Sequence, residues 1–110
     1  MIEKTVLDYL SEKLSADVVM EVPKNKSAFV LVEKTGSSED DHLYSATIAI
    51  QSWHESLLKA AELNEEVKTA MKEITLLDEI CRCRLNSDYN YTDTSTKSYR
   101  YQAVYDIVHY

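Results

Sequence analysis

The chain has almost no glycine: Gly36 is the only one among 110 residues. Phosphate-binding loops and dinucleotide-binding turns need several glycines, because the backbone must approach a phosphate closely there. The sequence also has no nucleophile elbow, P-loop or dinucleotide-binding fingerprint. We therefore expect no cofactor. Because no nucleophile can be paired with a base, we expect no enzymatic activity and name no catalytic residue.

Long apolar segments are also missing. No segment approaches the roughly 20 apolar residues that a membrane-spanning helix needs, and the first residues lack the pattern of a secretory signal. The formal net charge of −7 argues against binding in a DNA groove, which requires a basic surface, and against docking on anionic lipid. We expect a cytosolic protein with reduced thiols.

Cysteine is scarce, with only Cys81 and Cys83. On one strand these two would lie about 7 Å apart, which is too far for an unstrained disulfide. We expect two small buried thiols. A metal site would need further ligands, for which His42, His54 and His109 are the remaining candidates, and no ligand spacing supports it. We therefore expect no metal.

Two segments have a helical period. The longer one, Trp53–Ile74, carries apolar residues three, four and seven positions apart, which form one stripe on a helix. Ser52 and Glu55 have the spacing of a capping box at its start. Ile2–Leu14 repeats apolar residues every four positions and predicts a first helix.

Most of the remaining chain alternates apolar and polar residues, as strands do. The predicted strands are a short one at Val18–Val22, and longer ones at Ala28–Thr35, Leu43–Trp53, Glu79–Ser87 and Tyr99–Tyr110. With the helices they give the order α-β-β-β-α-β-β over a single domain, residues 1–110. The predicted class is α+β, a mostly antiparallel sheet of about four to five strands packed with two helices.

Burial patterns follow from the same strands. Phe29–Val32 is continuously apolar, which predicts a strand covered on both faces. In the next strand Tyr44, Ala46, Ile48 and Ile50 alternate with more polar residues and are expected to face the core.

Two polar segments, Gly36–Asp41 and Asn86–Ser98, predict connections between strands. The second contains Asp88–Asp93, which begins like a calcium loop. Asp93 stands where that loop needs glycine and Tyr99 stands where it needs glutamate, so we reject calcium binding. The run of three acids in the first connection, Glu39–Asp41, is expected to be solvated, and no ligand pattern supports ion binding there.

Tyrosine is abundant, with eight in the chain and six of them from residue 89 onward. Tyr99, Tyr101 and Tyr105 share one face of the last predicted strand. They fit cross-strand aromatic pairs or a subunit interface, where tyrosine is enriched. Stacking on single-stranded nucleic acid is a third interpretation, for which only Lys97 and Arg100 supply nearby positive charge.

Four segments resemble small tail proteins of long-tailed bacteriophages and prophages of Gram-positive bacteria. They are MIEKTVLDYL at Met1–Leu10, FVLVEKTG at Phe29–Gly36, LNSDYNYTD at Leu85–Asp93 and YRYQAVYD at Tyr99–Asp106. The likeness extends over nearly the whole chain and its order of elements. Among those tail proteins, the chain resembles the tail-terminator and tail-completion group.

The resemblance implies an α+β fold whose sheet packs with two helices, and a homo-oligomeric ring, with a hexamer as one size that it could take. Such a ring caps the tail tube and joins the tail to the head. The implied partners are further copies of the chain, the tail tube protein and the head–tail connector. The implied location is the virion tail, after assembly in the host cytoplasm. DNA would pass through without specific binding, since like charge prevents sticking.

These expectations select two sets of residues. The candidates for the subunit interface are Tyr99, Tyr101, Tyr105, Arg82 and Arg84. The candidates that face the lumen or a partner are Glu39, Asp40, Asp41, Asp88 and Asp93. A neck or connector subunit at the same junction remains an alternative, as does a small ligand-binding or regulatory α+β domain.

Overall fold

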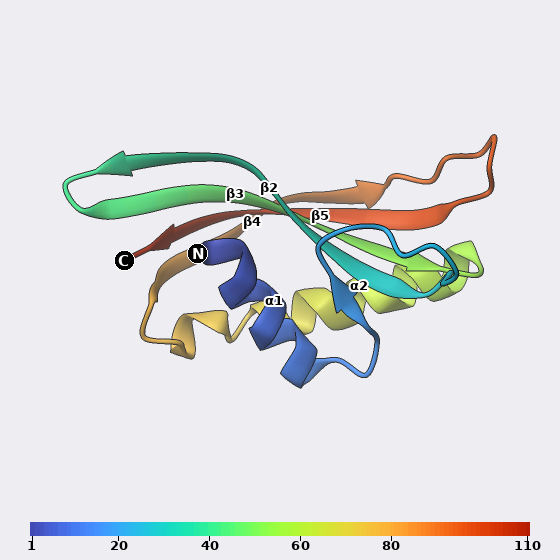
Figure 1. The fold of residues 1–110 in the computed structure, drawn as a ribbon, viewed down its shortest axis with the longest axis horizontal. Coiled ribbons are helices and arrows are strands. Elements are labelled where there is room, and N and C mark those ends of the chain that lie inside the picture. Colours follow the sequence, from blue (N-terminus) through green and yellow to red (C-terminus); the bar gives the residue numbers. More distant parts are fainter.

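The computed structural model describes residues 1–110 as two helices and a five-stranded sheet, and confirms the α+β class and the predicted order. Both helices lie on the same face of the sheet (Figure 1). The elements are α1 (Ile2–Lys13), β1 (Val18–Val19), β2 (Phe29–Asp40), β3 (Leu43–His54), α2 (Leu57–Met71), the 3₁₀ turn η1 (Ile74–Leu76), β4 (Ile80–Asn90) and β5 (Tyr99–His109).

The strands are arranged in the order β1-β2-β3-β5-β4. β1 runs parallel to β2, and every other neighbouring pair is antiparallel. The β2–β3 and β4–β5 hairpins extend toward opposite ends of the molecule, which measures 44 × 25 × 23 Å (Figure 1). The long strands therefore reach well beyond the part of the sheet that the helices cover.

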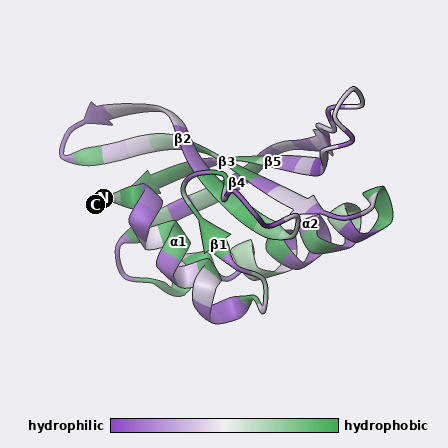
Figure 2. Ribbon diagram, turned by 45° about the vertical axis from the view of Figure 1, so that its right-hand side comes forward, coloured by the Kyte–Doolittle hydropathy of each residue, from purple (hydrophilic) through white to green (hydrophobic).

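The core lies between the helices and one face of the sheet. Val6 and Leu10 of α1 and Val67 of α2 are fully buried in one cluster with Ile48 and Ile50 of β3. Hydrophobic and hydrophilic bands alternate along the ribbons of both helices (Figure 2). The helical stripe and most of the strand alternation predicted these contacts correctly.

Tyr44 departs from the predicted core pattern. It is 42% exposed, although Ala46, Ile48 and Ile50 on the same face are buried as expected. Tyr44 lies near the tip of the β2–β3 hairpin, beyond the helices, and stacks on His109 with ring centres 5.5 Å apart. The alternation of a strand identifies a face, but it does not say how far a helix covers that face.

The predicted start of α2 was wrong. β3 continues to His54, and α2 begins at Leu57 with Ser56 as its N-cap, whose side chain accepts from the backbone N–H of Lys59. Ser52, the predicted cap, is instead fully buried in β3. Trp53 and His54 pair with β5, so the sheet ladder competes successfully with the helical pattern there.

The predicted connection at Gly36–Asp41 is mostly strand. β2 pairs with β3 as far as Asp40, and only Asp41 and His42 form the turn. Both turn residues have positive φ, 50° and 67°, the backbone that a two-residue hairpin turn requires at its centre. A glycine- and serine-rich sequence therefore forms a long, exposed hairpin arm.

β4 also extends further than predicted, to Asn90, so the predicted Asn86–Ser98 connection shortens to residues 91–98. Its pairing with β5 is irregular between Ile80 and Arg82 and again between Leu85 and Ser87. The first bulge changes the predicted alternation. Ile80 pairs with His109 and is buried on the helix side, whereas Arg82 and Arg84 lie on the opposite face.

Candidate functional site

No helix covers the second face of the sheet, which we call the open face. In β5 the buried residues Ala103, Tyr105 and Ile107 belong to the helix-side core, so the alternate residues lie on the open face. Cross-strand partners share a face, which extends the surface to β3 and β4. The open face contains Thr47, Ala49, Gln51, Trp53, Arg82, Arg84, Tyr89, Arg100, Gln102, Val104, Asp106 and Val108.

One end of the open face holds an aromatic cluster around Arg100. The rings of Phe29 and Trp53 stack with centres 5.0 Å apart. The guanidinium carbon of Arg100 lies 4.7 Å from the centre of the Trp53 ring and 5.0 Å from that of Tyr91. Arg100 Nε also donates to the Tyr91 carbonyl at 2.9 Å. The cation is thus held by two aromatic rings and a backbone oxygen.

A chain of hydrogen bonds crosses the sheet beside this cluster. Trp53 Nε1 donates to Gln51 Oε1 at 2.9 Å, and Gln51 Nε2 donates to Gln102 Oε1 at 2.8 Å. Gln102 in turn donates to the Tyr89 hydroxyl. The chain links β3, β5 and β4. The polar groups at this end of the open face are therefore already paired within the molecule.

The other end of the open face contains two unpaired cations. Arg82 and Arg84 are exposed, and neither belongs to any of the salt bridges in the molecule. They line a hollow of about 430 Å³ together with parts of β2, β3 and β5. The nearby Asp106 carboxylate instead accepts from Asn86 at 3.0 Å and from Thr47 at 3.5 Å. This end of the open face is therefore available to an anionic partner.

The tip of the β2–β3 hairpin has the opposite charge. Glu39, Asp40 and Asp41 are exposed, and none forms a salt bridge. The ribbon at the end of β2 is correspondingly hydrophilic (Figure 2). These three predicted site residues lie together at the end of one projecting arm.

The tyrosines of β5 lie on the helix side of the sheet rather than on the open face. Tyr105 is only 4% exposed, and burial raises the pKa of its hydroxyl. Tyr105 therefore cannot serve as a surface contact, and its assignment to a subunit interface was wrong; for this residue the core interpretation is correct. Tyr99 and Tyr101 are half-buried.

Asp88 and Asp93 have separate environments. Asp88 lies in β4 rather than in a loop, and it faces α2, where its carboxylate accepts from Asn64 and forms a 3.3 Å salt bridge with Lys68. Asp93 does lie in the connection between β4 and β5. It accepts two hydrogen bonds from Ser95, which lower the pKa of its carboxyl group. Asp88 is thus a structural residue of the helix–sheet contact.

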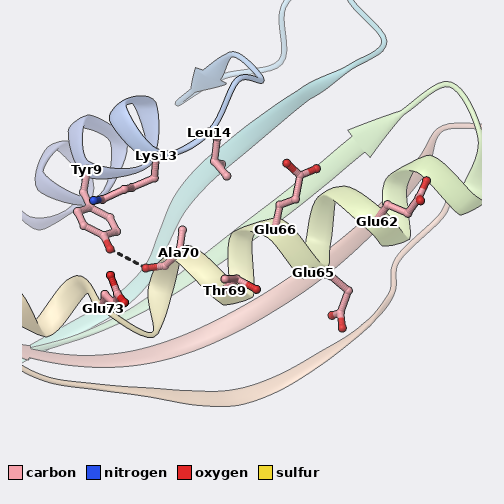
Figure 3. A pocket seen from close by; sticks show the side chains of 9 residues that line it. All are labelled: Tyr9, Lys13, Leu14, Glu62, Glu65, Glu66, Thr69, Ala70 and Glu73. Carbon is pink, nitrogen blue, oxygen red and sulfur yellow. Dashed lines mark hydrogen bonds between the residues drawn. The ribbon is translucent and has the colours of Figure 1, made fainter.

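An acidic groove runs between the two helices (Figure 3). It has a volume of about 510 Å³, and its lining includes Glu62, Glu65, Glu66 and Glu73, with Lys13 as the only cation. No histidine, cysteine or serine lines the groove, and its hydroxyl groups are those of Tyr9 and Thr69.

The cysteines do not match the expectation of two buried thiols. Cys81 is exposed, because it occupies the bulged position at the start of β4, and Cys83 is partly buried; both are free. Burial raises the pKa of the Cys83 thiol to about 11. No three His, Cys, Asp or Glu side chains gather where they could hold a metal ion. Neither helix is long and apolar enough to span a membrane.

The sequence patterns did not indicate the Arg100 cluster. Trp53 stood both at the end of the predicted strand Leu43–Trp53 and at the start of the predicted helix, and the alternation of Tyr99–Tyr110 singled out the tyrosines rather than the intervening Arg100 and Gln102. The signal that could have found the cluster is the place of Trp53 at the end of the predicted strand, because in the sheet Trp53 pairs with Arg100.

Comparison with known proteins assigns the chain to no group. No family model matches the chain, and no curated protein sequence matches it.

Proposed function

We propose that this chain is a structural protein of a bacteriophage or prophage virion, a tail terminator that caps the tail tube and joins the tail to the head. The order of its helices and strands agrees with the order that the resemblance implies. The observation that carries the proposal is that the sheet has two long unpaired edges on opposite sides.

The first edge is β2. The short strand β1 pairs only with Val30 and Leu31, so the remainder of β2 as far as Asp40 has no partner on its outer side. The second edge is β4, which pairs with β5 alone. Residues 33–40 of β2 and most of β4 are exposed. Both edges therefore present free backbone N–H and C=O groups.

Two different edges favour a head-to-tail contact between copies. Such a contact uses one patch on one copy and another patch on the next, and it closes into a ring when the rotation between copies divides a full turn. Unpaired edges are usually covered or shortened in monomeric proteins. Long edges that remain uncovered therefore support a protein whose edges are completed by its own neighbours.

The charge of the chain suits a ring around DNA. With a net charge of −7, a channel lined by this protein repels the phosphate backbone, so that DNA can slide without being held. We assign the acidic tip Glu39–Asp41 and the half-buried Asp93 of the β4–β5 connection to surfaces that face the lumen or a partner, a further copy of the chain included. The partners are the tail tube protein and the head–tail connector, with no catalytic step. The chain would collect in the host cytoplasm before it joins the virion tail.

The test is to delete the gene from the phage or prophage that encodes it and to examine the particles by electron microscopy. The expected result is overlong tails without heads, beside filled heads without tails, because tube growth no longer stops. Expression of the wild-type chain from a plasmid should restore particles of normal length. Tails of normal length attached to heads, in the absence of this chain, would refute the proposal.

A further inference from the structure

We infer that the two edges meet in the ring through opposite charges: the acidic hairpin arm of one copy docks on the arginine-bearing end of β4 in the next copy. The acidic hairpin arm is Gly36–Asp41, and the docking residues are Arg82 and Arg84. This inference rests on the proposed function and names the contact by which its ring would close.

The hydrogen-bonded ladder shows that the two surfaces lie at the same level of the sheet. Ser38 of β2 pairs with Ser45, which pairs with Val108, which pairs with Arg82 of β4. The same path connects Gly36 through Thr47 and Asp106 to Arg84. A neighbour placed beside β4 without a shift along the strands would bring its Ser38 next to Arg82.

Strand direction is compatible with this placement. β2 is antiparallel to β3, β3 to β5, and β5 to β4, so β2 and β4 run in opposite directions within one copy. Successive copies related by rotation about a ring axis keep the same orientation relative to that axis. The β2 edge of one copy therefore meets the β4 edge of the next as an antiparallel pair, the more stable arrangement per residue.

The charges on the two surfaces are complementary. Glu39, Asp40 and Asp41 carry three carboxylates that have no partner within the chain, and Arg82 and Arg84 have none either. Arginine forms two parallel hydrogen bonds with a carboxylate, which fixes direction as well as adding attraction. On the open face, Asp40 of the neighbour would lie one alternate position beyond Ser38, within reach of the Arg82 side chain.

A nucleic acid is a poorer occupant of the same surface. Asp106 lies beside Arg84, and the molecule as a whole carries seven excess negative charges, which oppose a phosphate chain. In the register given above, the arm of a second copy brings Asp40 within reach of Arg82 and lays Gly36 beside Arg84. These features favour a second copy of the chain over a nucleic acid. The order of charges along the arm sets the direction in which the arm lies along β4.

The experiment uses two charge-reversed variants of the full chain. The first is Arg82→Glu/Arg84→Glu and the second is Glu39→Lys/Asp40→Lys. Each variant alone places like charges at the contact. Each should therefore raise the dissociation constant of self-association by about tenfold or more. When the two variants are mixed in equal amounts, the contacts between them alternate between the wild-type pair of charges and the reversed pair. Assembly should therefore return, and only rings with an even number of subunits should form.

Two control variants carry the same changes in net charge at other places. Lys24→Glu/Lys72→Glu matches the first variant, and Glu62→Lys/Glu66→Lys, in the groove between the helices, matches the second. Both controls should assemble as the wild type does. Sedimentation velocity measures assembly in solution, and electron microscopy with purified tail tubes measures it for a chain that needs the tube. Circular dichroism of every variant confirms folding.

The outcomes separate the inference from the proposed function. If the wild type forms rings in solution or on tubes, and charge reversal or mixing changes nothing, the docking inference is refuted while the terminator role stands. If the first variant assembles normally but loses binding to DNA, the arginines serve nucleic acid instead. If the wild type forms no ring under either condition, both the inference and the proposed function fail.

Discussion

The Tyr9 hydroxyl donates a 2.6 Å hydrogen bond to the backbone carbonyl of Ala70, which ties α1 to the last turn of α2. The two residues are separated by 61 positions in the sequence. Carbonyls in the last turn of a helix lack an intrahelical partner, so a side chain from another element can satisfy them. This bond is the direct polar link between the two helices (Figure 3).

Replacing Tyr9 with phenylalanine should lower the free energy of unfolding by about 1 kcal/mol, the usual contribution of one such hydrogen bond. The Ala70 carbonyl keeps a bond from the backbone N–H of Glu73, so the loss should not exceed that value greatly. Urea unfolding followed by circular dichroism measures it. Tyr110→Phe is the matched control, because Tyr110 is 67% exposed and should leave the midpoint unchanged. Equal midpoints for Tyr9→Phe and the wild type would contradict the assigned role.

Substitution of Tyr105 with alanine should destabilise the monomer by about 3–5 kcal/mol, as for other large aromatic residues removed from a core. Its ring is buried among residues of the helix-side cluster. Tyr99→Ala and Tyr101→Ala, at half-buried positions, should each cost less. Urea unfolding of the three variants decides the order. A Tyr105→Ala protein as stable as the wild type would restore the interface interpretation for this residue.

Much of the fold could be predicted because its signals are periodic. The four-residue repeat of α1 and the alternation of β3 each identify a buried face, and Val6, Leu10, Ile48 and Ile50 are fully buried there. Strand ends could not be predicted from the same signal. The arm after Gly36 has no buried side chains and is held in strand form by backbone pairing with β3, which leaves no apolar pattern.

The candidate site was predicted less well, because it depends on register. A single bulge at the start of β4 buries Ile80 and moves Arg82 and Arg84 to the open face, whereas a regular strand would put all three on one side. The predicted interface therefore grouped Arg82 and Arg84, which lie on the open face, with Tyr99, Tyr101 and Tyr105, which lie on the opposite face.

Two serines, Ser52 and Ser56, are candidates for the N-cap of α2, and substitution of each tests which one fills that position. Ser56→Ala removes the oxygen that accepts from the Lys59 N–H and should cost about 1 kcal/mol. Ser52→Ala should be neutral or slightly stabilising, because the buried Ser52 hydroxyl has no hydrogen-bond partner. Urea midpoints of the two variants measure the difference. The reverse order, with Ser52→Ala the more damaging, would move the helix start back toward the predicted position.

The raised thiol pKa of Cys83 predicts a loss of stability in alkali. Burial raises this pKa from 9.0 to about 11, with a smaller contribution from the charge of Asp106. Above pH 9 the unfolded chain releases the proton while the folded chain retains it, so the unfolded state is favoured increasingly as the pH rises. The stability linked to Cys83 is therefore complete below pH 9 and is lost between pH 9 and 11. The raised pKa values of Tyr9 and Tyr105 act with the same sign, beginning near pH 10.

The variant Cys83→Ala should separate the contribution of the thiol to the alkaline loss of stability from the contribution of the tyrosines. Its urea midpoint should fall less than that of the wild type between pH 8 and pH 11, whereas from pH 6 to 8 the two should run parallel, offset only by the lost packing of the sulfur. Cys81→Ala, at the exposed bulge, should follow the wild type throughout. If Cys83→Ala loses stability as steeply as the wild type between pH 9 and 11, the alkaline transition belongs to the tyrosines, and the thiol of Cys83 must already reach solvent in the folded protein.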